Sequence, residues 1–158
     1  MGRPEVSGEE NLLKLVDADA PEPGDYHLQE QIGFVLRKAH QRHVSIFASH
    51  IGDLTPPQFA ALAKLHDIGE TSQNQLGQLI AMDAATVKGV IDRLKARGLV
   101  ALSKHEGDKR RLLVSLTAQG RDAVLSLIPR AQAITAETLE PLSSKEAATL
   151  LKLLAKLA

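Results

Sequence analysis

The chain has 158 residues, 19 basic and 19 acidic side chains and a formal net charge of zero, and this length suits one compact domain and excludes a large multidomain enzyme. The lack of cysteine excludes a disulfide scaffold and a thiolate zinc site, and no apolar run resembles a signal peptide or a membrane span. These two absences predict a cytoplasmic protein, and because 44% of the residues are hydrophobic but only 3% are aromatic, we expect mainly α-helical structure.

The N-terminal residues 1–27 are predicted to form an acidic arm outside the folded domain. Residues 1–31 contain eight acidic and two basic side chains, and the stretch "DADAPEPGD" has the composition of a linker. Ser7 and Glu10 have the spacing of a capping box, which predicts a short helix over residues 8–16. An arm without fixed structure is the alternative.

The next two elements are predicted to be helices. Residues 28–51 carry apolar side chains at helical spacing, among them Ile32, Leu36, Ala39 and Ile46. The stretch "GDLTPPQ" ends this helix and begins another, because Thr55 is placed to cap a helix whose first turn contains two prolines.

A helix-turn-helix followed by a β-hairpin is predicted in the middle of the chain. A short helix from about Ser72 precedes a helix that Asp83 caps and that ends before Gly98; its predicted buried face comprises Val87, Val90, Ile91 and Leu94. The stretches "LVALSKHE" and "RRLLVSL", separated by a turn at Gly107, are typical of two strands. This order predicts a winged helix-turn-helix lobe over residues 55–116.

Two further helices are predicted within residues 117–158. The first follows Thr117 and is expected to kink at Pro129, and the second has a capping box at Ser143 and Glu146. The last helix carries more leucines than one small lobe buries. This predicts a dimer interface formed by the terminal helices, 28–51 and 117–158, and packing on the first long helix of the same chain is the alternative.

The positive charge is concentrated in one segment. Residues 72–116 contain eight basic and four acidic side chains, a net charge of +4. Such a segment in a neutral chain indicates a surface for a polyanion, although solvated helices carry similar charge without any partner.

Three stretches, "LTPPQFAALAKL", "TVKGVIDRLKARGLV" and "DKRRLLVSLTAQG", resemble the MarR family of bacterial transcription regulators, in the family's order and spacing over residues 28–158. The resemblance implies a homodimer with a winged helix-turn-helix lobe in each protomer. It further implies binding to a pseudo-palindromic operator in double-stranded DNA, usually as a repressor that a small-molecule effector releases.

Roles on DNA follow for the helix after Asp83, which is expected to enter the major groove. Its predicted base-facing residues are Ala84, Thr86, which could contact a thymine methyl or a phosphate, and Lys88, which could reach guanine. Because Ala84, Ala85 and Gly89 offer few groups that read bases, we expect few direct hydrogen bonds and a contribution from DNA shape. Arg93 and Arg97 lie farther along, where phosphates are nearer than bases.

Two other segments are expected to contact DNA. Ser72, Gln73 and Asn74 lie near a helix N-terminus that attracts phosphate, and capping is the alternative role for Ser72. At the hairpin tip the resemblance implies that Asp108 orients Arg110 toward the minor groove. The neighbouring Lys109 and Arg111 are expected to touch phosphates.

Histidines are concentrated in the two helices before the predicted turn. His40, His43, His50 and His66 are predicted to gather with Arg37 where the family binds small anions, here an aromatic acid or its coenzyme A thioester. A metal-responsive regulator is the alternative, because His40 and His43 have a possible ligand spacing, although no acid on that face completes a site. Histidines in ordinary core contacts are the third interpretation.

Other function classes are less well supported. The sequence contains no nucleophile elbow, P-loop, dinucleotide fingerprint or HExxH motif, so we expect neither an enzyme nor a cofactor. A winged-helix interaction module that never contacts DNA is the remaining alternative.

Overall fold

The computed structural model describes residues 26–108 and 112–158, so the predicted acidic arm and its short helix lie outside the described residues except at the arm's end. The chain divides into two compact units, Met1–His43 and Val44–Ala158. The prediction that the folded domain begins at residue 28 stays a prediction.

The first long helix is confirmed. It begins with a 3-10 turn, η1 (Leu28–Glu30), and continues as α2 (Ile32–His50), which runs from the first unit into the second. Most of its predicted apolar stripe is exposed: Ile32 is 64% and Leu36 is 42% exposed, whereas Ile46 is buried.

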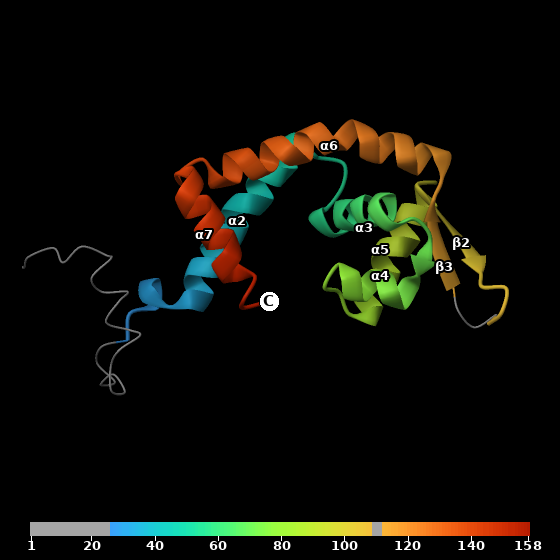
Figure 1. The fold of residues 1–158 in the computed structure, drawn as a ribbon, viewed down its shortest axis with the longest axis horizontal. Coiled ribbons are helices and arrows are strands. Elements are labelled where there is room, and N and C mark those ends of the chain that lie inside the picture. Colours follow the sequence, from blue (N-terminus) through green and yellow to red (C-terminus); the bar gives the residue numbers. More distant parts are fainter. Residues whose placement is uncertain (1–25, 109–111) are drawn as a thin grey trace, which may run out of the picture. The chain divides into compact units, whose positions relative to one another are not determined.

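The second unit contains the winged helix-turn-helix fold that the sequence predicts. In chain order its remaining elements are α3 (Pro56–Ile68), β1 (Thr71–Ser72), α4 (Gln73–Leu79), α5 (Ala84–Ala96), β2 (Val100–Lys104), β3 (Leu112–Leu116), α6 (Ala118–Leu139) and α7 (Ser144–Leu154). Figure 1 shows α3, α4 and α5 gathered beside the small sheet. α6 remains one continuous helix through Pro129.

The predicted helix caps are confirmed. Thr55 forms a capping box with Gln58, and the side chains of Asp83, Thr117 and Ser143 each accept a backbone N–H three residues later. These bonds satisfy backbone donors that would otherwise lack a partner at a helix start. The caps therefore fix where α3, α5, α6 and α7 begin.

The sheet has three antiparallel strands in the order β1-β3-β2, one more than the sequence predicts. The extra strand is β1, which pairs Thr71 with Val114 and Ser72 with Leu113. A two-residue strand shows no alternation of apolar and polar side chains, so its pairing depends on the fold around it. β1 joins the start of α4 to the wing hairpin.

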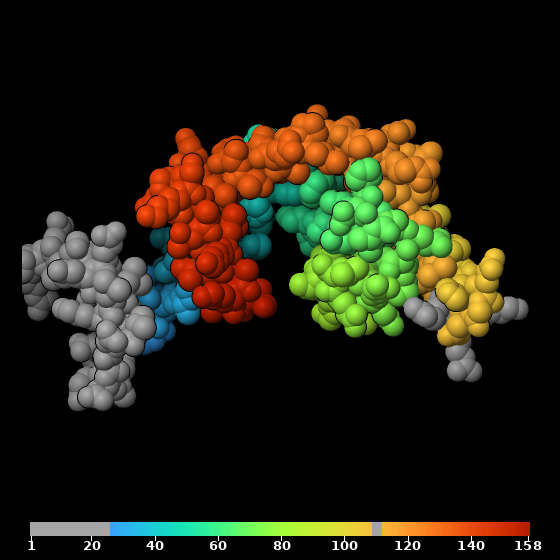
Figure 2. Space-filling model, viewed as in Figure 1, coloured from blue at the N-terminus to red at the C-terminus, as the bar shows by residue number. Residues whose placement is uncertain are grey.

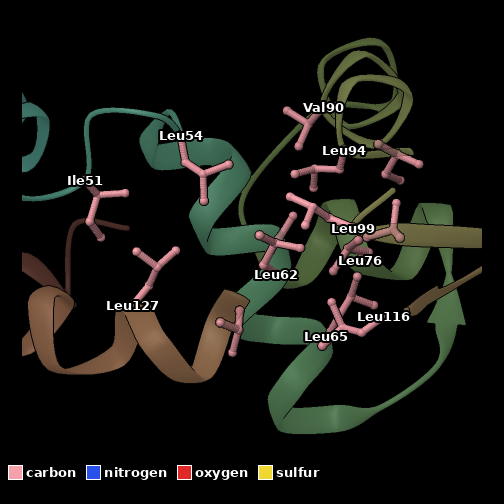
Figure 3. Close-up of a cluster of buried hydrophobic side chains, with 14 of the residues drawn as sticks. Ile51, Leu54, Leu62, Leu65, Leu76, Val90, Leu94, Leu99, Leu116 and Leu127 are labelled. Atoms are coloured by element: carbon pink, nitrogen blue, oxygen red, sulfur yellow. The ribbon is translucent and has the colours of Figure 1, made fainter. Parts of the chain in front are cut away.

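The hydrophobic core lies between α3, α4, α5, α6 and the sheet (Figure 3). All four predicted residues of the buried face of α5 are at most 4% exposed. Leu62, Leu76 and Val114, from α3, α4 and β3, have no exposed surface at all. α5 is therefore fixed from one side by neighbours in its own chain.

Close backbone packing holds α6 against the start of β2. A Cβ atom at Gly120 would overlap the carbonyl oxygen of Leu99, so glycine is required at this position. The hydroxyl of Thr117 accepts the N–H of Gly120 and donates to the carbonyl of Gly98 at 2.6 Å. The start of α6 is thus held against the residues that precede β2.

The helix α7 has no buried residue. Three of its four leucines and the one that follows the helix, Leu150, Leu151, Leu153 and Leu157, are between 38% and 72% exposed. The single chain therefore leaves this apolar face uncovered. No helix in residues 26–108 or 112–158 is both long and apolar enough to span a membrane.

Candidate nucleic-acid interface

The turn between α4 and α5 is tightly packed. The N–H of Met82 donates to the carbonyl of Gly77 at 2.8 Å, and a Cβ at Gly77 would lie 3.0 Å from the Met82 carbonyl oxygen and 3.2 Å from Val87 Cγ1. Ala81 adopts a φ of 54°, in the left-handed region that favours glycine. The two helices therefore have one fixed orientation.

Asp83 organises the N-terminus of α5. Its Oδ1 accepts the N–H of Thr86 at 2.7 Å and its Oδ2 accepts the Thr86 hydroxyl at 3.0 Å. These bonds, the backbone one first, lower the pKa of Asp83 below its ordinary value. The hydroxyl of Thr86 is thus engaged within the chain, and the residue as a whole is exposed.

The outer face of α5 is composed mainly of small side chains. Ala84, Thr86 and Lys88 are exposed, and Lys88 Nζ lies 2.6 Å from Asp92 Oδ2. At Gly89 a Cβ atom would have no neighbour within 4 Å, so the fold itself does not require glycine there. This face allows another surface to approach the helix backbone closely.

The two arginines of α5 differ in their partners. Arg93 is exposed and forms no ion pair with any residue that the structure describes. Arg97, at the C-terminal cap, donates from NH1 to the carbonyl oxygen of Asp53 at 2.5 Å and from NH2 to Asp53 Oδ2 at 3.1 Å. The predicted phosphate contact of Arg97 stays a prediction, and its guanidinium already has partners in the chain.

The predicted contacts of α4 also differ in availability. Ser72 is 9% exposed, and its hydroxyl accepts the N–H of Gln75 at 3.2 Å, so its capping role is confirmed. In the first turn Gln73 is half-buried and Asn74 is exposed. Asn74 is thus the most accessible of the three predicted residues.

The hairpin next to these helices forms as expected. β2 pairs with β3 from Val100 and Leu116 to Lys104 and Leu112. In Figure 2 the end of the hairpin that is coloured yellow projects from the green surface formed by α3 and α4. Asp108 is exposed.

Three residues of the predicted wing tip, Lys109, Arg110 and Arg111, lie outside the described residues. The orientation of Arg110 by Asp108 therefore stays a prediction.

Three predicted ligand residues belong to the first unit. The guanidinium carbon of Arg37 lies 5.4 Å from the centre of the Phe34 ring. His40 is exposed and His43 is half-buried. Their convergence with the other histidines stays a prediction.

The other two predicted ligand residues belong to the second unit. His50 Nε2 lies 2.7 Å from Glu137 Oε2, and Arg130 donates to the His50 carbonyl oxygen at 3.4 Å. His66 lines a crevice of about 170 Å³ beside Arg121. Across residues 26–108 and 112–158, no group of three or more histidine, aspartate or glutamate side chains is arranged to hold a metal ion.

The acidic partners of Lys88 and Arg97 were not predicted from the sequence. The pairing of Lys88 with Asp92 has the four-residue spacing of helix ion pairs and could have been found from the sequence. The pairing of Arg97 with Asp53 spans 44 positions, and no local pattern indicates it.

Comparison with known proteins connects this geometry to a group of regulators. The model of the MarR family matches residues 54–112. The HTH-type transcriptional repressor NicR of Pseudomonas putida is 42% identical over 134 residues, which cover 84% of this chain and 85% of NicR.

Solved structures show the same similarity. BpsR of Bordetella bronchiseptica, whose DNA binding is regulated by 6-hydroxynicotinic acid, is 44% identical with a TM-score of 0.81, over 85% of this chain and 97% of that chain. A mutant of MarR from Escherichia coli, complexed with operator DNA, is 25% identical with a TM-score of 0.75, over 80% of this chain and 92% of that chain.

Proposed function

The chain belongs to the MarR family of transcriptional regulators, and we propose that it represses transcription from a pseudo-palindromic DNA operator until a small aromatic acid releases it. The observation that carries the DNA-binding part is the α4–α5 pair. One side of α5 is buried in the core, its N-terminus is capped, and its small-residue face is exposed beside the hairpin.

We infer that α5 lies in the major groove, which is wide enough for an α-helix. Thr86 is exposed and its methyl group suits a thymine methyl, and Ala84 allows close approach. Lys88 reaches guanine by leaving Asp92, which costs little because both side chains are more than half exposed. Arg93 binds a phosphate, since its guanidinium is exposed.

At the hairpin, the proposal depends on the sequence. Arg110 enters the minor groove, Asp108 orients it, and Lys109 and Arg111 contact phosphates. In α4, Gln73 and Asn74 donate to a phosphate near the helix N-terminus. The MarR protein of Escherichia coli, 25% identical in its mutant form, is known in complex with operator DNA.

We propose that two chains bind the operator together. The leucines of α7 are exposed, and so are apolar side chains of α2, and we propose that a second copy covers each of these faces. A dimer places two recognition helices about 34–36 Å apart, one turn of DNA, so that both engage half-sites.

For the effector, we propose an aromatic carboxylic acid. The DNA binding of BpsR, 44% identical to this chain, is regulated by 6-hydroxynicotinic acid. Arg37, His40, His43, His50 and His66 are the side chains proposed to pair with the carboxylate. Such an acid releases the operator only if it binds the released geometry more tightly than the DNA-binding one.

The DNA-binding proposal is tested by fluorescence anisotropy with the duplex upstream of the chain's own gene and a scrambled duplex at matched salt. We expect tighter binding to the upstream duplex, and Arg110→Ala should weaken that binding while leaving the fold intact. Equal affinity for both duplexes, or an Arg110→Ala variant equal to the parent, would contradict the proposal.

The effector proposal is tested by adding 6-hydroxynicotinic acid, an aromatic coenzyme A thioester or zinc to the operator complex. We expect release by the free acid. If only the thioester or only zinc released the operator, the effector would belong to that chemical class and not to the free aromatic acids. Binding that no compound reverses would overturn the effector proposal and leave DNA binding intact.

A further inference from the structure

We propose that Asp53, an acidic residue in the loop before α3, is a positioning residue for operator binding that acts by holding Arg97 at the end of α5. The inference rests on the proposed role of α5 in the major groove. Under this inference the acidic side chain of Asp53 strengthens binding to DNA, although DNA is itself negatively charged.

The contact between the two residues restrains Arg97 in two directions. One guanidinium nitrogen donates to the Asp53 carbonyl oxygen at 2.5 Å and the other to its carboxylate at 3.1 Å. Arg97 is itself the C-terminal cap of α5, so its backbone belongs to the helix end. A planar guanidinium with two acceptors on one residue is confined more than a singly bonded ammonium.

The loop that carries Asp53 is firmly anchored. Ile51 has no exposed surface and Leu54 is 6% exposed, so apolar anchors lie on both sides of Asp53. Thr55 then starts α3 with a capping box. Asp53 therefore offers Arg97 fixed acceptors.

The same loop begins at a contact with α6. His50 ends α2, its ring lies 2.7 Å from Glu137 of α6, and its carbonyl accepts from Arg130 of α6 at 3.4 Å. Residues 50–54 thus connect α6 to the C-terminal end of α5 through polar contacts at both ends. The position of α5 is consequently tied to the helix that precedes α7.

Stability does not explain the Asp53–Arg97 pair. The Asp53 side chain is 70% exposed and the Arg97 side chain 39%, and exposed ion pairs contribute little to the free energy of unfolding. An unpaired acid beside a DNA-binding helix repels phosphate. The pair is accounted for if it fixes the angle of α5, whose other end is fixed by Asp83.

The two possible roles of Arg97 predict opposite effects for Asp53. If Arg97 contacted a phosphate, Asp53 would compete for its guanidinium, and Asp53→Ala would strengthen binding to every duplex. If Arg97 is held to position α5, Asp53→Ala weakens binding to the operator and leaves binding to unrelated DNA unchanged.

The test uses the full chain with operator and scrambled duplexes between 50 and 200 mM salt. We expect Asp53→Ala and Arg97→Ala each to weaken operator binding about tenfold. Asp53→Ala removes the carboxylate bond and Arg97→Ala removes both bonds, so the double variant should lose no more than Arg97→Ala alone. The salt slope should stay unchanged, since no phosphate contact is lost.

Asp67→Ala is the matched control, because Asp67 is an exposed acid of α3 whose partner, Lys64, lies three residues away. Its operator affinity should stay within about twofold of the parent. Asp53→Asn, which keeps both acceptors, should retain most operator affinity and covers the case in which Asp53→Ala unfolds.

Tighter binding by Asp53→Ala or Asp53→Asn, or a salt slope lowered by about one in Arg97→Ala, would overturn the inference. A parent chain that binds operator and scrambled duplexes equally would instead overturn the proposed function.

Discussion

The helices α5 and α7 have similar sequence patterns and opposite surroundings. Each is amphipathic and begins at a side-chain cap. Four apolar residues of α5 are at most 4% exposed, whereas α7 has no buried residue. An amphipathic pattern thus predicts that one face of a helix is buried. It does not indicate whether the residues that bury this face belong to the same chain or to a second copy.

The difference between α5 and α7 separates burial that folding of one chain provides from burial that association of two chains provides. The face of α5 is covered by α3, α4 and β2 of the same chain, so its order depends on folding alone. In the proposed dimer a second copy covers the face of α7, which makes its cover depend on protein concentration. The following experiments are expected to separate these two dependences.

The largest effect is expected from Leu94→Ala in α5. Leu94 has no exposed surface, and removing a fully buried leucine side chain costs about 2–5 kcal/mol of the free energy of unfolding. Urea denaturation measures the loss. Leu112→Ala, at a side chain that is 41% exposed, should cost less than about 1 kcal/mol. Equal losses in the two variants would mean that the α5 face is not the closed core described above.

A second effect is expected from Leu151→Asp in α7, where the side chain is 54% exposed. A carboxylate buried in a dimer interface should raise the dimer dissociation constant at least about thirtyfold, while the helical circular dichroism stays the same. Sedimentation velocity measures the change, with Lys152→Glu as the charge control. A variant that dissociates no more readily than the parent would show that α7 is not part of the interface.

A smaller effect is expected from Ala81→Gly in the turn before α5. Alanine pays a steric cost at a φ of 54°, and glycine removes that cost but adds backbone freedom to the unfolded chain. We expect a gain of up to about 1 kcal/mol in the free energy of unfolding, measured by urea denaturation. A loss would show that the Ala81 methyl makes a favourable contact that outweighs the strain.

The smallest effect is expected at acid pH from the cap of α5. Hydrogen bonds from Thr86 lower the folded pKa of Asp83, so its contribution to stability is present above the unfolded pKa and is lost as pH falls through the folded pKa. The parent should therefore be more stable than Asp83→Asn at pH 6, and the difference should shrink below about pH 3.9. Thermal unfolding of both proteins at pH 6 and below about pH 3.9 measures the difference in stability. A difference that stays the same at both pH values would exclude the Asp83 carboxylate as its source.

Local signals were sufficient to predict most of the fold. The caps at Thr55, Asp83, Thr117 and Ser143 lie where their side chains fix a helix start, and the apolar spacing of α5 identified its buried face correctly. The strand β1 was missed because its two residues are ordered by pairing with β3, which lies about 40 positions away in the chain.

The candidate site was less predictable than the fold. Sequence placed Lys88 and Arg97 on the DNA-facing helix but gave no sign that Arg97 is held by Asp53. It also predicted His50 as a ligand residue without indicating Glu137 as its partner. Contacts between distant segments depend on how the loop before α3 folds, which local spacing does not encode.

The open space at Gly89 has a consequence for engineering this regulator. A side chain added there meets no neighbour within 4 Å, and replacing an interior helical glycine by alanine favours the helix by up to about 1 kcal/mol. Position 89 can therefore take a Cβ atom without a clash inside the fold, whereas proline there would break α5. If α5 enters the major groove as proposed, a library without proline at this one codon yields variants with altered operator preference.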